Sequence, residues 1–173
     1  STPQIKWASA NGHHVYDDVG NRYIDMTSGI FVANAGHSNP LILKAIKKQL
    51  DDQLLYSYQY PTEIRESFVK ELVALSPKYF NKVVLLNSGS EATDAAYRLI
   101  KSWGKVNNKK YIISFEGSYH GRCVGSMAIC GDKGGLSWSG MKDEDVVFLK
   151  FPYDKNDRLD LNLLPPLDQI AAF

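Results

Sequence analysis

Residues 85–92, Leu-Leu-Asn-Ser-Gly-Ser-Glu-Ala, decide the fold that we expect for this chain. The apolar run Val83–Leu86, which leads into the polar turn, predicts a strand covered on both faces. Ser88 stands three residues before Glu91, which is the spacing of a capping box at the start of a helix. We therefore expect a strand, a short turn and a helix that begins at about Gly89.

The turn at Ser88, Gly89 and Ser90 has the properties of an anion site. The first amides of a helix lack intrahelical partners and carry partial positive charge, which favours a bound anion by about 0.3–2 kcal/mol. Gly89 lets a ligand approach the backbone closely, and Ser90 adds a hydroxyl donor. The Gly-Lys-Ser/Thr of a Walker loop does not follow, so the turn by itself is equally consistent with a helix cap that binds nothing.

A second motif, Ser118-Tyr119-His120-Gly121-Arg122, follows the next expected strand, Tyr111–Phe115. A strand, a helix and a second strand form a βαβ unit, whose ligands bind at the carboxyl ends of the parallel strands. Both motifs follow such ends, so we expect them to face one crevice. An aromatic ring, an imidazole and a guanidinium beside an anion site suit an aromatic, phosphorylated cofactor and an acidic substrate.

Each of these side chains also has a simpler interpretation. Tyr119 can be a packing residue, His120 a hydrogen-bonded core or turn histidine, and Arg122 a surface ion-pair partner. A hydrolase using Ser88 or Ser90 with His120 is another alternative, but the sequence lacks the Gly-x-Ser-x-Gly elbow of such enzymes. The convergence of the motifs beside an anion site favours a cofactor site.

On these residues, the chain resembles the N-terminal part of the class III aminotransferases, pyridoxal-phosphate enzymes of fold type I. Four segments carry the resemblance, in the family's order and approximate spacing, over nearly the whole chain. They are Tyr16-Asp17-Asp18-Val19-Gly20-Asn21-Arg22-Tyr23-Ile24-Asp25, Ser28-Gly29-Ile30 leading to Gly36-His37-Ser38-Asn39-Pro40, Asn87-Ser88-Gly89-Ser90-Glu91-Ala92, and Phe115-Glu116-Gly117-Ser118-Tyr119-His120-Gly121-Arg122. The resemblance implies an α/β fold, a mainly parallel sheet with flanking helices, preceded by a short N-terminal β-hairpin segment.

The resemblance also implies roles in binding the cofactor. In the family, the turn matching Ser88, Gly89 and Ser90 holds the phosphate of pyridoxal 5'-phosphate. The aromatic residue matching Tyr119 stacks on the pyridine ring, and the histidine matching His120 lies beside it. The cofactor expected for this protein is therefore pyridoxal 5'-phosphate.

For the substrates, the resemblance implies an amino acid or amine as donor and a 2-oxo acid as acceptor. In family members that act on omega-amino acids, the arginine matching Arg122 can hold the substrate carboxylate, and a guanidinium suits that task. Phe31, in the Gly29–Gly36 stretch, would lie near the substrate pocket. The family builds its site across a dimer, so we expect a homodimer.

The family also needs a lysine for the Schiff base and an acidic partner for the pyridinium nitrogen, both well C-terminal of the Tyr119 motif. No lysine of this chain stands in a matching context, so we expect no catalytic residue here and the Schiff-base lysine beyond Phe173. We expect the chain to be the N-terminal portion of a longer parent protein. Other fold type I chemistry (aminomutase, decarboxylase or epimerase) and a non-catalytic binding or assembly subunit are the alternatives.

Composition narrows the classes further. The chain has 173 residues, 44% of them hydrophobic and 23% charged, which suits a globular core. Its net charge is +1 and its basic residues form no stripe, so we expect no nucleic-acid partner. No long apolar run or leader is visible, so we expect no membrane partner and a cytoplasmic location, with the mitochondrial matrix as the alternative. Cys123 and Cys130 are too loosely spaced for a zinc site, so we expect no metal.

We expect residues 1–36 to contribute to a small domain and residues 37–173 to begin the large, cofactor-binding domain. The remaining patterns predict a hairpin in 13–26, helices over 40–52 and from 61 onward with apolar stripes in the core, strands at 146–149 and 170–173, and a mobile loop at 130–145. Tyr56, Tyr58 and Tyr60 predict either a partly exposed strand or loop, or a subunit contact.

Overall fold

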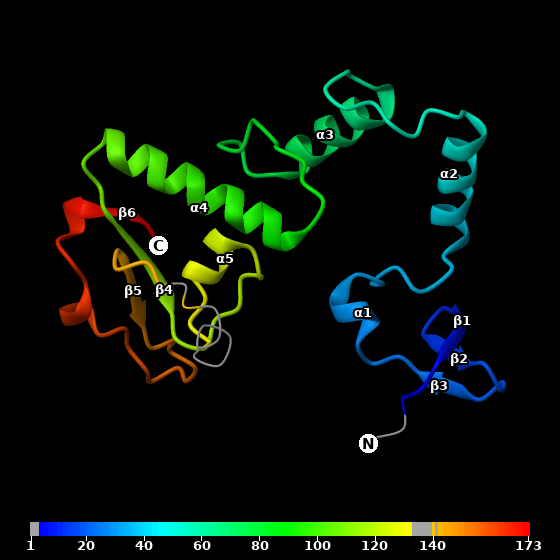
Figure 1. Cartoon of the computed structure of the whole chain (residues 1–173), viewed down its shortest axis with the longest axis horizontal. Coiled ribbons are helices and arrows are strands. Elements are labelled where there is room, and N and C mark those ends of the chain that lie inside the picture. Colours follow the sequence, from blue (N-terminus) through cyan, green and yellow to red (C-terminus); the bar gives the residue numbers. More distant parts are fainter. Residues whose placement is uncertain (1–3, 133–139, 141) are drawn as a thin grey trace. The chain divides into compact units, whose positions relative to one another are not determined.

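The computed structural model describes residues 4–132, 140 and 142–173, and the chain divides into two compact units, Ser1–Lys78 and Tyr79–Phe173 (Figure 1). The first unit holds a small antiparallel sheet and two longer helices, and the second holds a parallel sheet with flanking helices. The expected α/β fold with an N-terminal hairpin is therefore confirmed. The domain boundary at residue 36 stays a prediction.

The sheet of the first unit has the order β1-β2-β3, with β1 at Trp7–Asn11, β2 at His14–Asp17 and β3 at Arg22–Ile24. The predicted hairpin is β2 and β3, and β1 adds an antiparallel strand that the sequence did not indicate. Asp17 organises the turn between β2 and β3, because its carboxylate accepts hydrogen bonds from the amides of Val19 at 3.1 Å and Asn21 at 2.8 Å. Val15 on β2 is the buried apolar residue of this sheet.

The two longer helices of the first unit begin at or within two residues of the predicted starts, 40 and 61. Helix α2, Pro40–Asp51, starts after Asn39, whose side chain accepts hydrogen bonds from the amides of the first turn. Helix α3, Glu63–Leu75, starts after Thr62, whose hydroxyl accepts from the amide of Arg65 at 3.4 Å. An Asn or Thr side chain at this position satisfies amides that the helix leaves unpaired.

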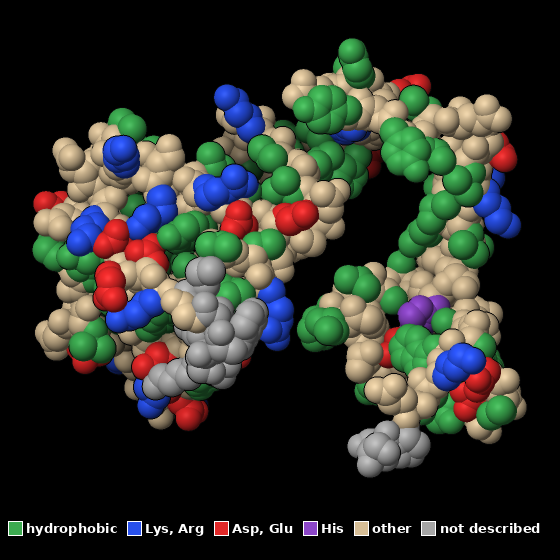
Figure 2. Space-filling model, viewed as in Figure 1, with side chains coloured by type: hydrophobic (Ala, Val, Ile, Leu, Met, Phe, Trp, Pro, Cys, Tyr) green, Lys and Arg blue, Asp and Glu red, His purple; other side chains and the backbone are tan. Residues whose placement is uncertain are grey.

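The apolar stripes of α2 and α3 are not buried, so the expectation that they form core is wrong for this structure. Neither helix has a buried residue, and Figure 2 shows hydrophobic side chains at the surface over α2. Ile46 and Phe68, at the middle of the two stripes, are 52% and 53% exposed. Periodicity predicts which face of a helix is apolar, whereas burial also requires a partner to cover that face. Tyr56, Tyr58 and Tyr60 are also exposed, and they lie outside any strand.

The second unit is built around β4, Tyr111–Phe115, which pairs in parallel with β5, Val146–Leu149, and with β6, Ile170–Ala172. All of these strands were predicted. Two short 3-10 helices, Leu161–Leu163 and Leu167–Gln169, lie on the connection from β5 to β6. The core of the unit comes from β4, β5 and α5, Val124–Ala128; its buried apolar residues are Ile112, Ile113, Met127, Ala128, Cys130, Val146 and Leu149.

Helix α4, Gly89–Val106, lies beside α5 and β6 (Figure 1). Its last turns approach β6 closely at Gly104, where a Cβ atom would lie 3.3 Å from the Cβ of Ala171. Its middle approaches α5 at Gly125, where a Cβ atom would lie 2.5 Å from the ring of Tyr97. A larger side chain at Gly125 would force α5 and α4 apart, and one at Gly104 would overlap the carbonyl oxygen of Lys109 just after α4.

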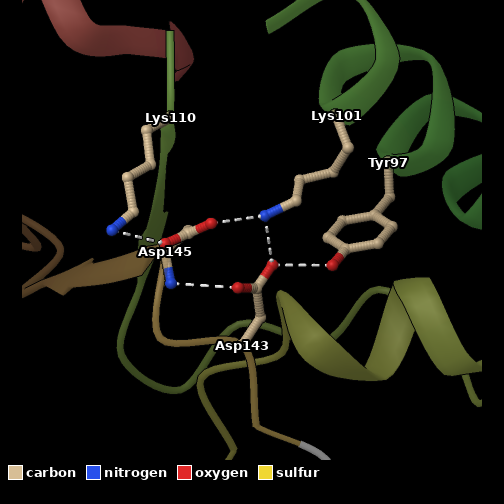
Figure 3. Close-up of polar contacts among 5 residues, drawn as sticks. All are labelled: Tyr97, Lys101, Lys110, Asp143 and Asp145. Carbon is tan, nitrogen blue, oxygen red and sulfur yellow. Dashed lines mark hydrogen bonds and ion pairs between the residues drawn. The ribbon is translucent and has the colours of Figure 1, made fainter. Parts of the chain in front are cut away.

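A cluster of polar side chains also fastens α4 to the segment before β5 (Figure 3). Lys101 contacts Asp143 at 3.0 Å and Asp145 at 2.8 Å, Tyr97 donates to Asp143 at 2.6 Å, and Lys110 contacts Asp145 at 3.2 Å. Burial and the hydrogen bond to Asp143 raise the pKa of Tyr97 to about 12. Burial alone would lower the pKa of Lys101, but its hydrogen bonds to the two carboxylates outweigh burial and raise it.

One predicted strand is missing, because residues 83–86 adopt no regular structure. Val84 is 74% exposed, so the expectation of a strand covered on both faces is wrong for this structure. A strand forms only when its amides and carbonyls pair with a neighbour, and among the described residues no strand pairs with this segment. Half of the predicted loop at 130–145, namely residues 133–139 and 141, lies outside the described residues.

Candidate functional site

The first turn of α4 has the geometry of a capped helix with free donors. Ser88 is the N-cap in an extended conformation, and its hydroxyl accepts the amide hydrogen of Glu91 at 3.2 Å. The carboxylate of Glu91 reaches back and accepts the amide hydrogen of Asn87 at 2.8 Å. This is the predicted capping box, with its return bond made one residue before the cap.

The capping box leaves two amides of this turn available. Among the described residues, the amides of Gly89 and Ser90 have no hydrogen-bond partner. Apart from its chain neighbours and its own helix backbone, no atom of the described residues lies within 4 Å of the place that a Cβ atom of Gly89 would occupy, so this side of the turn is open. Two unpaired amides, a nearby hydroxyl and the positive end of an 18-residue helix form a donor set that suits a phosphate group.

The structure brings the second motif against this turn. The segment 119–122 lies between β4 and α5, and the amide of Arg122 donates to the hydroxyl oxygen of Ser90 at 3.2 Å. The hydroxyl of Thr93 donates to the carbonyl oxygen of His120 at 2.6 Å. Gly121 lies between these bonds with φ of +127°, and a Cβ atom there would lie 2.7 Å from Cα and Cβ of Ser90. The two motifs, which are about thirty residues apart in sequence, therefore contact each other, as the sequence predicts.

Tyr119 and Arg122 extend from this contact into solvent. Tyr119 is 63% exposed, so much of its ring is accessible to a ligand. The guanidinium carbon of Arg122 lies 5.9 Å from the centre of that ring, within the range of a cation–π interaction. An accessible ring, a cation and two free amides thus lie on neighbouring residues of one unit.

His120 is held mainly through its backbone. Its amide donates to the sulfur of Cys130 at 3.1 Å, and its carbonyl accepts from Thr93. Burial lowers the pKa of His120, so its ring is neutral at neutral pH. In the described part of the chain, the imidazole forms no hydrogen bond with Ser88 or Ser90, whose hydroxyl oxygens accept backbone amides instead. This arrangement does not support a hydrolase.

Phe31 belongs to the first unit, so its predicted place near the substrate pocket stays a prediction. It ends α1, Ser28–Phe31, a short turn in which φ is positive at every residue, from 48° to 67°. Left-handed backbone costs about 1–2 kcal/mol per residue for side chains other than glycine. Phe31 is 77% exposed, so neither burial nor a preferred backbone explains this conformation.

Asp25 holds the start of that turn, a role that the sequence reasoning missed. One carboxylate oxygen accepts from the amide and hydroxyl of Thr27 and from the amide of Ser28, and the other lies 2.7 Å from Nε2 of His37. The hydrogen bond with His37, followed by those from Thr27, holds the pKa of Asp25 far below its usual value. Asp25 and His37 belong to two of the quoted segments, but no local pattern links residues twelve positions apart.

Thr93, Asp94 and Cys130 were also missed. Each contacts the backbone of the segment 120–125, and none stands out in the sequence because Thr and Asp are ordinary helix residues and Cys130 is a small buried side chain. Across the residues that the structure describes, no group of His, Cys, Asp and Glu side chains could hold a metal ion. No helix in the same residues is long and apolar enough to cross a membrane.

Comparison with known proteins shows the family. The family described as Aminotransferase class-III matches residues 1–167. This match covers nearly the whole chain, and the chain therefore belongs to the class-III aminotransferases. The predicted resemblance is confirmed.

Individual relatives agree. A LysW-aminoadipate semialdehyde/glutamate semialdehyde transaminase of Sulfurisphaera tokodaii is 37% identical over 122 residues, which are 70% of this chain and 31% of the relative. An acetylornithine aminotransferase of Aquifex aeolicus is 35% identical over 159 residues, which are 83% of this chain and 41% of the relative.

Among solved structures, the taurine:2-oxoglutarate aminotransferase of Bifidobacterium kashiwanohense, in complex with PLP and glutamate, matches with a TM-score of 0.77 and 28% identity over 87% of this chain and 33% of that chain. The chain thus spans about a third of the length of the proteins it matches.

Proposed function

We propose that this class-III aminotransferase chain is part of a longer protein that transfers an amino group from an amino acid or amine to a 2-oxo acid with pyridoxal 5'-phosphate. The observation that carries the proposal is the contact of Ser90 with Arg122, because it joins the turn with the free amides of α4 to the segment that carries the exposed ring of Tyr119. A phosphate donor set next to an aromatic face fits a phosphorylated, aromatic cofactor.

The residues of this chain have distinct tasks in the proposed site. The amides of Gly89 and Ser90 bind the cofactor phosphate, and the hydroxyl of Ser90 can still donate a hydrogen bond because it accepts one from Arg122. The ring of Tyr119 packs on the pyridine ring, and the neutral imidazole of His120 lies beside it without adding charge. When bound, the cofactor supplies an electron sink for the substrate carbon that carries the amino group.

Arg122 is the proposed contact for a substrate carboxylate. Its amide is fixed by Ser90, whereas its side chain is exposed and can turn toward a ligand. A planar guanidinium binds a carboxylate with two parallel hydrogen bonds. Relatives named for aminoadipate or glutamate semialdehyde and for acetylornithine are consistent with a donor that carries an acid group as well as an amine. The Schiff-base lysine and a second subunit belong to the parent protein in this proposal.

Substitution of Ser90 tests the phosphate site directly. In the full-length protein, Ser90→Asp places a negative charge beside the phosphate, and Ser90→Asn places a neutral group of the same shape there. Both side chains can accept the amide hydrogen of Arg122, and an acidic residue is compatible with the first turn of a helix. We expect Ser90→Asp to lose pyridoxal-phosphate affinity by at least about tenfold relative to Ser90→Asn, since like charges held about 5 Å apart repel by more than about 1.4 kcal/mol. Equal cofactor contents in the two purified variants would place the phosphate elsewhere.

A further inference from the structure

Three neighbouring side chains on the first two turns of α4 bind the backbone of the segment 120–125. Ser90 accepts the amide hydrogen of Arg122 at 3.2 Å, and Thr93 donates to the carbonyl oxygen of His120 at 2.6 Å. Asp94 accepts the amide hydrogen of Gly125 at 2.7 Å. Because all three bonds are made to peptide groups, they fix the path of the segment rather than the rotamers of its side chains.

The bond from Thr93 is the shortest of the three. A hydroxyl has a single proton to donate. The hydroxyl oxygen of Thr93 also lies 3.0 Å from the carbonyl oxygen of Gly89 and 3.1 Å from that of Ser90, which are the usual acceptors within a helix. We assign the proton to the bond with His120, because that distance is the shortest of the three.

Backbone contacts, rather than the side chains of Tyr119 and Arg122, hold the segment at this point. The side chains of Tyr119 and Arg122 are exposed, so their burial contributes little to its position. On its other side, the amide of His120 donates to the sulfur of Cys130, and the thiol of Cys130 lies 3.6 Å from the carbonyl oxygen of Gly121. The carbonyl oxygen of Ser118 accepts the amide hydrogen of Gly131. The α4 side chains therefore supply one of the two sets of bonds that fix the backbone on either side of His120.

We propose that Thr93 and Asp94 are positioning residues, which hold the segment at a fixed place along α4 so that the ring of Tyr119 and the free amides of Gly89 and Ser90 meet one ligand. Neither residue touches the ligand. The inference rests on the proposed function, because the ligand is pyridoxal 5'-phosphate. The bond from Thr93 to the carbonyl of His120 opposes rotation of the peptide between His120 and Gly121, and such a rotation would move the preceding residue, Tyr119, relative to α4.

Thr93→Val tests the proposal in the full-length protein, because valine keeps the shape of threonine and removes its hydroxyl. Thr93→Ser restores the hydroxyl, and Ser102→Val places valine at an exposed position of the same helix as a control for helix propensity. We expect Thr93→Val to weaken binding of pyridoxal 5'-phosphate to the cofactor-free protein by about 2- to 12-fold, the range expected for one hydrogen bond. We also expect a smaller induced circular dichroism of the bound cofactor, and wild-type values for Thr93→Ser and Ser102→Val.

A second pair of variants covers the case in which Thr93→Val does not fold. Asp94→Leu removes the acceptor for the amide of Gly125, whereas Asp94→Asn keeps an acceptor while it loses the charge that faces Arg98 at 3.2 Å. We expect Asp94→Leu to weaken cofactor binding and Asp94→Asn to leave it near the wild-type value.

The outcomes distinguish a positioning role from a purely structural one, and both from failure of the proposed function. A lower melting temperature for Thr93→Val or Asp94→Leu, with cofactor affinity and circular dichroism at wild-type values, would show that these residues only stabilise the fold. The same conclusion would follow if Thr93→Ser bound the cofactor as weakly as Thr93→Val. Failure of the wild-type protein to bind pyridoxal 5'-phosphate would instead overturn the proposed function, and this inference with it.

Discussion

Two glycines of the candidate site should respond to alanine in opposite ways. Gly121 has φ of +127°, and a Cβ atom there would lie 2.7 Å from Cα and Cβ of Ser90. Gly89 begins α4 with ordinary helical backbone, and a Cβ atom there would meet nothing within 4 Å. The same one-methyl change therefore tests close backbone contact at Gly121 and open ligand space at Gly89.

The expected magnitudes follow from these surroundings. Gly121→Ala adds backbone strain of about 1–3 kcal/mol and steric overlap of about 1–3 kcal/mol, so we expect a loss of about 2–6 kcal/mol in the free energy of unfolding. Gly89→Ala should stabilise the cofactor-free protein by about 0.4–1 kcal/mol, because alanine restricts the unfolded chain. Its methyl group stands where the phosphate would approach, so we expect cofactor affinity to fall by about 5- to 150-fold, equivalent to about 1–3 kcal/mol of overpacking.

The assay is denaturant unfolding of the cofactor-free, full-length protein together with titration by pyridoxal 5'-phosphate. Gly121→Ala should unfold at a lower denaturant concentration, and Gly89→Ala should unfold at an equal or higher one while it binds the cofactor less tightly. Wild-type unfolding of Gly121→Ala would refute the close contact of the two motifs. Wild-type cofactor affinity in Gly89→Ala would refute the assignment of the open space to the phosphate.

Three further changes address other parts of the molecule. Arg122→Lys should raise KM for an amino substrate with a distal carboxylate and leave cofactor content unchanged, because lysine cannot form the two parallel hydrogen bonds of a guanidinium. Steady-state kinetics with acidic and neutral amino substrates would show an unchanged preference if Arg122 is only structural. Tyr97→Phe should make stability fall less steeply as the pH rises from about 10 to about 12. The pKa of the wild-type tyrosine is raised from 10.0 to about 12, so Tyr97 keeps its proton in the folded state and releases it on unfolding. Equal slopes of the unfolding midpoints against pH in both proteins would contradict this interaction. Asp25→Asn should loosen the turn at Ser28–Phe31, because the neutral amide binds His37 and the turn amides more weakly. Hydrogen exchange of the turn amides should become faster, and unchanged exchange would contradict this role of Asp25.

Local signals predicted the helix starts well. Asn39, Thr62 and Ser88 each precede a helix, and the side chain of each accepts amide hydrogens from the first turn. Capping acts over three or four residues, so the sequence alone contains the information that it needs. The strands at 111–115 and 146–149 were also predictable, because their apolar runs are buried on the sheet that they form.

Signals that depend on a distant partner were less informative. The run at 83–86 is as apolar as β5, yet it forms no strand, and the stripes of α2 and α3 remain exposed. An apolar pattern reports that a segment can be buried, and the outcome depends on what covers it. The comparison proteins are more than twice as long as this chain, so they contain residues that can cover these segments. Slow hydrogen exchange at 83–86 in the full-length protein would show such cover.

The candidate site was predictable to the extent that its residues lie in two short motifs. We predicted that the two motifs meet because a βαβ unit would bring them together. The first strand of that unit is absent here, yet the motifs still meet, since the contact of Ser90 with Arg122 needs only α4 and the turn after β4. Thr93 and Asp94 had no such signal, since a threonine and an aspartate inside a helix are usually solvent-facing or locally bonded. Their role emerges only from the hydrogen bonds that cross to His120 and Gly125. If those bonds set the position of Tyr119, the precision of the cofactor site depends on α4 residues that contact no ligand, and substitutions there should change the optical signal of the bound cofactor more than the stability of the fold.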